Sequence, residues 1–345
     1  MRRARATPRK ARSTRADVAR LAAVSPAVVS YVINGGPRPV SPETRSRVEQ
    51  AIATLGYRPN ETARALVRGR SHHVGLVAVD TTGPFYSELA AAIDRELFLR
   101  GLTLVTASST YRLQDENTSP LALLLEHNVT AALMATQVTA ADIAFAEAHD
   151  LPLVALNEQV PRPGLNASIV NYRDATVQAV DHLVDHGKRH IGFVGGYYSR
   201  DTRYPAWRHA LEQAGLRPGP SVQSDWTPEA GYEAGRWITG QRFSGEELDA
   251  LFIASDAIAL GCVAALREAG LRIPEDIAIM SFDGTKLAPF IGPGLTTMAQ
   301  PIEHIAADVV ALILDPEREP GTHLSYEATM VRRRSCGCTP TGSPT

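Results

Sequence analysis

The sequence predicts an α/β protein in which a small all-α module precedes a larger body of two lobes, each built on a doubly wound parallel sheet. Residues 13–57 carry short helical patterns of apolar residues separated by turn signals. From residue 71 onward, strand-like and helix-like segments alternate, which is typical of parallel sheets with helices on both faces. The pattern of the first half of this body returns in its second half, which indicates two similar lobes.

The composition is that of a globular protein with more than one domain. The chain has 345 residues, of which 44% are hydrophobic and 21% charged, and this length favours two or three domains. No apolar run reaches the length of a membrane-spanning helix, and the Arg-rich N-terminus lacks the apolar stretch of a secretory signal. Three cysteines are too few, and odd in number, for a disulfide framework. We therefore expect a cytoplasmic protein that does not engage a membrane.

Charge is distributed unevenly along the chain. Residues 1–70 carry 15 Lys and Arg against 4 Asp and Glu, whereas the remaining residues carry 20 against 33. A basic module fused to an acidic body indicates a polyanionic partner for the module alone. We expect residues 1–12 to be a disordered basic arm, since a solvated tail accounts for them, whereas residues 13–70 mix charge with patterned apolar positions.

The basic module has the pattern of a helix-turn-helix unit. A first helix over residues 15–22 is followed by a short turn. Ser25 and Pro26 then suit the N-cap and the first position of a second helix, which should run to about Ile33. A third helix opens at Ser41 and packs against the first two. Any small three-helix bundle would share this pattern, and the positive charge is what favours DNA as the partner.

The same module carries an ordered string of motif residues: Asp17-Val18-Ala19, Val24-Ser25, Val29-Ser30-x-Val32-Ile33-Asn34, Val40-Ser41-x-x-Thr44-Arg45 and Leu55-Gly56-Tyr57-x-Pro59-Asn60-x-x-Ala63-Arg64-x-Leu66. The string resembles the lactose/purine repressor family of bacterial transcription regulators. The resemblance implies that the helix from Ser25 enters the major groove. It also implies a hinge helix and linker over residues 58–70, whose Leu66 wedges into a minor-groove base step. The alternative for Leu66 is an ordinary core leucine. Ala23 departs from the family, which usually has glycine in this turn.

The resemblance assigns DNA contacts to Arg15, Ser25, Pro26, Ala27, Ser30, Tyr31, Asn34, Arg45, Asn60, Ala63, Arg64 and Leu66. Pro26 and Ala27 offer apolar contact only, for example with a thymine methyl group, so Tyr31 is the main polar reader of bases. Arg15 and Arg45 suit phosphate contacts, which position the protein without reading sequence.

The body contains an internal repeat, because the sequence of residues 73–77 returns in similar form at residues 190–194. We expect strands at 73–79, 102–108, 131–135, 152–156, 190–195, 221–225, 250–254 and 277–282, separated by helices such as 86–100, 174–186, 203–214, 228–239 and 257–269. This pattern resembles the periplasmic-binding-protein-like effector domain of the same family, in which the chain crosses between lobes three times. We expect an effector-binding and dimerisation domain over residues 71–337, followed by a flexible tail at 338–345. Within this domain, the N-lobe should comprise about 71–170 and 299–325, and the C-lobe about 171–298 and 326–337.

Ligands of open α/β sheets bind beyond the carboxyl ends of the strands, where polar and aromatic residues gather here. By resemblance the expected effector contacts are Phe85, Tyr86, Asn157, Arg203, Trp226, Ser255, Asp256 and Asp283. An arginine fork, a carboxylate and a flat ring together suit a polyol, so we expect a sugar, with a nucleobase or nucleoside as the second class. The alternative is a surface salt bridge between Arg203 and Asp283 beside a half-buried Trp226.

Other classes of protein fit the sequence less well. His182, His186 and His190 are spaced for a metal face, but Gly187 should end that helix before His190. Cys336 and Cys338 form a single pair with no second pair beside them, so we expect no metal site. Gly192-x-x-Gly195-Gly196 lacks the spacing of a dinucleotide-binding loop, and the sequence has no P-loop or Gly-x-Ser-x-Gly motif. An enzyme would also leave the basic module unexplained, so we expect no cofactor and no enzyme activity. A two-lobed sugar-binding transport protein is the main alternative, but it would not carry a helix-turn-helix. We therefore predict a cytoplasmic, nucleoid-associated homodimer that represses transcription from a palindromic operator under the control of a small molecule.

Overall fold

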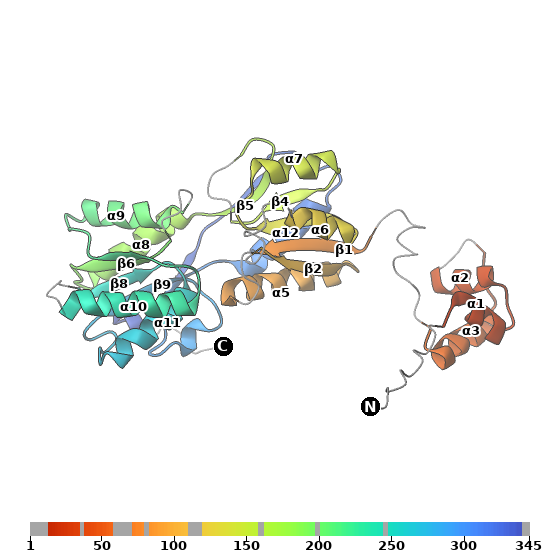
Figure 1. The fold of residues 1–345 in the computed structure, drawn as a ribbon, viewed down its shortest axis with the longest axis horizontal. Coiled ribbons are helices and arrows are strands. Elements are labelled where there is room, and N and C mark those ends of the chain that lie inside the picture. The colour runs from red at the N-terminus through yellow and green to blue at the C-terminus, as the bar shows by residue number, and fades with distance from the viewer. Residues whose placement is uncertain are drawn as a thin grey trace, which may run out of the picture. The chain divides into compact units, whose positions relative to one another are not determined.

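The computed structural model describes residues 13–34, 38–57, 71–78, 83–109, 119–157, 162–196, 201–243 and 248–339. It divides into two compact units, Met1–Ser71 and His72–Thr345 (Figure 1). The predicted DNA contacts Asn60, Ala63, Arg64 and Leu66 lie outside the described residues, as do the arm at 1–12 and the tail from residue 340.

The described part of the first unit consists of α1 (Arg15–Leu21), α2 (Pro26–Asn34) and α3 (Pro42–Leu55). Thr14 and Asp17 form a capping box at α1, in which each side chain accepts the other residue's backbone N–H. Ser41 accepts the N–H of Thr44 and so caps α3. The helices enclose a small core in which Val18, Val29 and Val48 are inaccessible to solvent. The predicted three-helix unit is confirmed.

The turn between α1 and α2 contains a backbone conformation that is unfavourable for its residue. Ala23 has φ 53°, in the left-handed region that favours glycine. Its N–H donates to the carbonyl of Arg20, and the N–H of Val24 donates to that of Ala19, so the turn is closed by backbone bonds. The family's usual glycine would adopt this turn without a Cβ penalty, and the other contacts of the unit hold Ala23 there.

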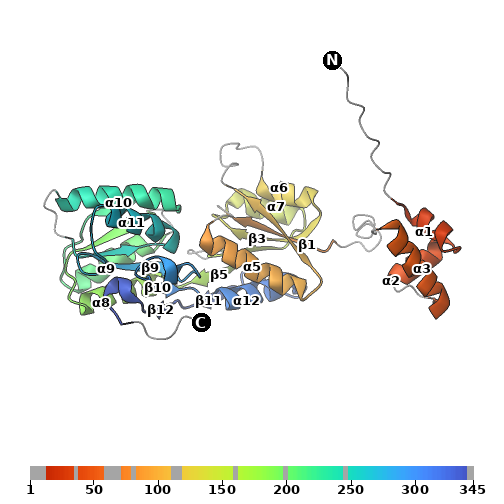
Figure 2. The ribbon, with the colours of Figure 1, turned by 90° about the horizontal axis from the view of Figure 1, so that it is seen from below.

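The first sheet of the body consists of parallel strands in the order β11-β5-β4-β3-β1-β2. Their bounds are β1 (His73–Ala78), β2 (Thr103–Ser108), β3 (Val129–Ala135), β4 (Leu153–Ala155), β5 (Asn166–Val170) and β11 (His323–Tyr326). One face is covered by α5 (Pro84–Phe98) and α12 (Ile302–Leu314), the other by α6 (Pro120–Glu126) and α7 (Ala140–Ala148) (Figures 1 and 2). Along β1, Leu76 faces the first pair of helices and Val77 the second, as the pleat of a doubly covered strand requires.

The second sheet has the order β12-β10-β9-β8-β6-β7 and repeats the arrangement. Its strands are β6 (Ile191–Gly195), β7 (Ser221–Gln223), β8 (Ala250–Ile253), β9 (Ala278–Asp283), β10 (Thr296–Ala299) and β12 (Thr329–Val331). The edge strand β12 runs antiparallel to β10, a departure from the predicted all-parallel sheet, while the other pairs are parallel. On one face lie α8 (Tyr172–Asp185) and α9 (Arg203–Gln213), on the other α10 (Pro228–Phe243) and α11 (Asp256–Glu268) (Figure 2).

The chain passes between the two sheets three times: from β5 into α8, from β10 into α12, and from β11 into β12. Two short 3-10 turns complete the second lobe, η1 (Ala288–Phe290) and η2 (Arg334–Cys336). The prediction of a helix-turn-helix unit followed by two doubly wound α/β lobes is confirmed.

Among the described residues, no single helix is long and apolar enough to cross a bilayer. Only α1 together with Pro26–Ile33, a pair bent by 103°, meets the length and composition of a broken span.

Candidate functional site

The start of α2 presents an exposed surface on the first unit. Ser25 caps the helix by accepting the N–H of Val28 at 3.3 Å. Pro26 and Ala27 in the first turn are exposed, whereas Val29 is fully buried. The helical period thus separates a face that forms the core from a face that is accessible to a double helix.

The other predicted DNA contacts among the described residues belong to the same three helices: Arg15, Ser30, Tyr31, Asn34 and Arg45. Arg15 and Arg45 are exposed, and Ser30 and Tyr31 are half-buried. Arg45 Nη1 lies 3.5 Å from the carbonyl oxygen of Val32 and 4.0 Å from the carboxylate of Glu49. Because this ion pair is exposed and loose, it contributes little to stability and leaves the guanidinium available to a phosphate.

Arg203, the first residue of α9, is the centre of the second candidate site. Its side chain is almost fully buried, and its Nε and Nη2 donate to the two carboxylate oxygens of Asp201, each at 2.9 Å. Its Nη1 donates to the carbonyl of Ala254, just beyond β8, at 2.7 Å. Burial alone would lower the pKa of Arg203, but the charge and hydrogen bonds of Asp201 outweigh burial and raise it. The guanidinium is therefore permanently charged and held in one orientation.

Three aromatic rings surround the same guanidinium. Its central carbon lies 4.4 Å from the ring centroid of Tyr172, 4.6 Å from that of Trp226 and 5.3 Å from that of Phe282. These rings come from the start of α8, the segment after β7 and the end of β9. Cation–π attraction is strongest where water is excluded, and this cage excludes it. The structure thus brings Trp226, another predicted effector contact, to Arg203, and Asp201 rather than Asp283 holds the ion pair.

Asp283, at the end of β9, lies in the same buried region. Its backbone has φ 104°, a strained conformation for any residue other than glycine and one that often marks functional sites. Burial and the nearby charge of Asp256 raise the pKa of Asp283 to about 8, against the opposing effect of Arg203. Gln300 Nε2 donates to Asp283 Oδ1 at 2.8 Å, and among the described residues Gln300 Oε1 is a buried acceptor without a donor. That oxygen could accept a bond from a ligand hydroxyl.

Asp256 and Ser255 are engaged at the start of α11. Ser255 caps the helix by accepting the N–H of Ile258 at 3.1 Å. Asp256 is fully buried and accepts bonds from the hydroxyl groups of Ser281, Thr285 and Thr297 and from the N–H of Thr285, at 2.6 to 3.1 Å. These bonds tie the carboxyl end of β9 and strand β10 to α11, so both carboxylate oxygens already have donors.

The first lobe contributes the remaining predicted contacts. Phe85 is buried at the start of α5, and its ring meets that of Tyr86 edge-on at 5.4 Å. Asn157, after β4, has φ 57° and its N–H donates to Ser168 Oγ. Helix α5 also bonds to the second lobe, because Glu88 Oε1 accepts the N–H of Lys286 at 2.8 Å. Burial raises the pKa of this glutamate.

A cavity of about 340 Å³ opens beside the Arg203 cage, where the chain passes between the sheets. It is lined by Ile169, Val170, Asn171, Tyr172, Arg173, Thr202, Ser325 and Glu327. A larger hollow of about 440 Å³ lies at the far end of α11, around Arg267 and Leu271, away from the predicted contacts.

The predicted effector contacts did not include four residues of this site: Tyr172, Asp201, Phe282 and Gln300. The signal for Asp201 was its place two residues before Arg203, within reach of a bidentate pair. The aromatic partners carried no local signal, because strand order alone brings α8, the β7 segment and β9 together.

A helix-turn-helix unit in one chain with a two-lobed α/β body defines a class of DNA-binding regulators with a sensor domain. Residues 14–60 match the family model "Bacterial regulatory proteins, lacI family", and residues 180–336 match "Periplasmic binding protein-like domain". The HTH-type transcriptional repressor PurR of Yersinia enterocolitica is 32% identical over 330 residues, which cover 92% of this chain and 95% of that protein.

Solved structures agree with the sequence matches. The lac repressor dimer bound to operator and the anti-inducer ONPF superposes with a TM-score of 0.79 at 25% identity, over 94% of this chain and 99% of that one. The complex of the transcriptional regulator CelR with cellobiose gives 0.67 at 27% identity, over 94% and 100%. The chain belongs to the lacI family of bacterial regulatory proteins. It is a DNA-binding transcriptional regulator, and its relatives are repressors rather than enzymes, as the sequence analysis predicted.

Proposed function

We propose that this protein is a cytoplasmic, dimeric repressor that binds a pseudo-palindromic operator and releases or tightens its hold when a sugar-like molecule binds between the lobes. The exposed first turn of α2, in the same chain as a two-lobed body, is the observation that carries the proposal. In the dimer each α2 enters a major groove, with Pro26 and Ala27 against base edges and Tyr31 donating or accepting hydrogen bonds. Phosphates are contacted by Arg15 and Arg45.

Residues 58–70 connect the two activities in this proposal. Asn60, Ala63, Arg64 and Leu66 form a hinge helix on DNA, and Leu66 from each subunit wedges into a base step and bends the site. Closure of the lobes changes the spacing of the two hinge segments. A coupling of about 1–3 kcal/mol between effector and operator is typical of such systems.

A sugar is the effector class best supported by the site. A rigid guanidinium loses little conformational entropy on binding a hydroxyl, and the buried acceptor Gln300 Oε1 has no donor within the part of the chain that the structure describes. Asp283 can accept or donate according to its protonation, and the faces of Trp226 and Tyr86 suit apolar C–H groups. The predicted contacts Phe85, Asn157, Ser255 and Asp256 shape the walls around these groups. That the CelR structure holds cellobiose supports the same class.

The experiment that tests the effector class is a thermal-shift screen of the full chain against a panel of sugars and nucleosides. Arg203→Lys keeps the charge but loses the forked geometry, so a sugar that stabilises the wild type should bind it about tenfold more weakly or worse. Arg208→Ala, an exposed change on the same helix, is the matched control and should leave the shift intact. Stabilisation by nucleosides alone, or equal shifts in both variants, would rule out the sugar proposal.

A further inference from the structure

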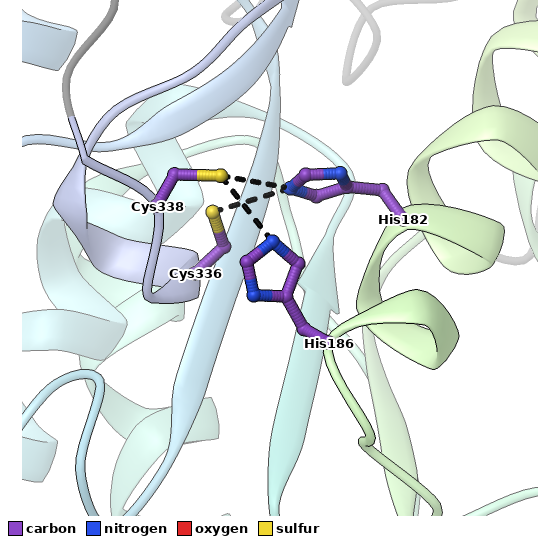
Figure 3. Close-up of side chains that lie close together, drawn as sticks. All are labelled: His182, His186, Cys336 and Cys338. Carbon is purple, nitrogen blue, oxygen red and sulfur yellow. Dashed lines mark hydrogen bonds between the residues drawn. The ribbon is translucent and has the colours of Figure 1, made fainter.

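Two histidines and two cysteines from distant parts of the chain meet on the second lobe. His182 lies in the last turn of α8 and His186 caps it, while Cys336 ends η2 and Cys338 follows two residues later. Figure 3 shows the four side chains pointing to one centre, the imidazoles from one side and the thiols from the other. One potential ligand atom from each lies within 4.8 Å of all the others.

The distances match those of a tetrahedral site. His182 Nε2 lies 3.4 Å from Cys336 Sγ and 3.5 Å from Cys338 Sγ, and His186 Nε2 lies 3.3 Å from Cys338 Sγ. With Zn–S bonds of about 2.3 Å and Zn–N bonds of about 2.0 Å, tetrahedral coordination separates sulfur and nitrogen ligands by about 3.5 Å. Small adjustments would therefore admit a cation at the centre of the four atoms.

The local backbone explains how each pair converges. Residues four apart on a helix face the same side, so His182 and His186 project together from the end of α8. Gly337, with φ 97°, lets the chain reverse between the two cysteines so that both sulfurs point the same way. The hydroxyl of Thr296 lies 3.0 Å from Cys336 Sγ and donates to the carbonyl of Arg333, so it links the side chain of Cys336 to the backbone of the same segment.

We propose that His182, His186, Cys336 and Cys338 bind one Zn²⁺ ion as a structural site that fastens the segment after β12 to α8. Two imidazoles and two thiolates form a closed donor set, and this set favours zinc over the harder cations Mg²⁺ and Ca²⁺. On binding, two S–H bonds break, two sulfur–zinc bonds form and both protons pass to solvent, so the site as a whole is neutral.

The sequence analysis expected no metal because it weighed the histidines and the cysteines separately, and each pair alone is half a site. The fold joins the two halves across 154 residues of sequence.

The test is the metal content of the full chain, purified with a non-thiol reductant and without added metal. The expected result is one zinc ion per chain, lost from Cys338→Ser and from His186→Asn. Cys338 is half-buried and His186 is exposed, so the fold should tolerate both changes. Cys262→Ala and His209→Asn are the matched controls: the first removes a buried thiol whose pKa burial raises to about 12, the second an exposed imidazole. Both should retain the ion.

Cobalt binding gives a second, spectroscopic measurement of the same site. Stripped wild-type protein titrated with Co²⁺ should develop the intense visible bands of tetrahedral cobalt and a sulfur-to-cobalt charge-transfer band. In His186→Asn the apparent affinity should fall by about tenfold or more. Wild-type protein that carries no zinc and binds cobalt no better than the two site variants would overturn the proposal. So would a Cys336–Cys338 disulfide that, once reduced, still yields no cobalt spectrum.

Discussion

Arg203 and Asp201 form a two-pronged ion pair in which Nε and Nη2 of the guanidinium lie 2.9 Å from the two carboxylate oxygens. The aromatic side chains of Tyr172, Trp226 and Phe282 surround the guanidinium. Both side chains of the ion pair are almost inaccessible to solvent. A buried charge held in this way is rigid, and rigidity is what a site needs to recognise hydroxyl groups by their directions. The same pair makes the lobe sensitive to the loss of either partner.

Arg203→Ala should destabilise the second unit strongly. The change leaves the carboxylate of Asp201 buried without its partner, which costs about 3–5 kcal/mol in comparable sites. Urea denaturation followed by tryptophan fluorescence would measure the loss, with Arg208→Ala as the exposed control. If Arg203→Ala unfolds no more readily than that control, the pair is not the buried support described above.

The pH dependence of stability should report on Asp283. Its pKa is about 8 in the folded chain, whereas an aspartate exposed in the unfolded chain has its ordinary pKa of 3.8. The folded state therefore holds a proton that the unfolded state lacks between about pH 4 and pH 8. Its contribution to stability is complete below that window and is lost as the pH rises through it.

Asp283→Asn replaces the carboxyl with a group that does not titrate, so this part of the pH dependence should disappear. Each unit of the pKa difference corresponds to about 1.4 kcal/mol, so denaturant midpoints at pH 5 and pH 8 should separate the two proteins clearly. Parallel pH profiles for wild type and variant would contradict a raised pKa for Asp283.

Ala23→Gly should stabilise the helix-turn-helix unit. Glycine adopts φ 53° without the Cβ penalty that Ala23 incurs, which is worth about 0.5–1 kcal/mol after the entropy of the unfolded chain is counted. Ala53→Gly, at an exposed site inside α3, should instead destabilise by about 1 kcal/mol. Hydrogen exchange of residues 13–57 in the full chain distinguishes the two directions. If Ala23→Gly does not slow the exchange, the turn is not strained.

Leu66→Ala should weaken specific operator binding and reduce the bend of the DNA, because the wedge that offsets unstacking is removed. Electrophoretic phasing or fluorescence measurements of the bend angle test this directly. Leu66→Met keeps an apolar wedge and should retain most of the bend. An unchanged bend in Leu66→Ala would show that this residue is core rather than wedge.

Local signals in the sequence were enough to predict the three helices of the first unit, together with α5, α8, α9, α10 and α11 and eight strands of the body. Ser41 and Pro42 at the start of α3, and the glycine at its end, are short-range features whose physics does not depend on the rest of the fold. Strands β5, β10, β11 and β12 were not anticipated, because their sequences are short and become strands only beside neighbours far along the chain.

The sites were predictable only in part, for the same reason. Arg203 and Trp226, two of the predicted effector contacts, lie together, and Tyr172 and Phe282 join them through strand order. His182 and Cys336 meet through tertiary contacts alone. Side-chain chemistry can be read locally, whereas the partner of a buried group is decided by the whole fold.

The most direct test of the account is selection of genomic DNA fragments by the purified full chain, followed by affinity measurement over a range of salt concentrations. The account predicts that a pseudo-palindromic fragment is enriched. Its affinity should fall steeply with salt as several phosphates are neutralised, and one small molecule should change the affinity. Binding to all fragments with equal affinity, with or without metabolites, would contradict it.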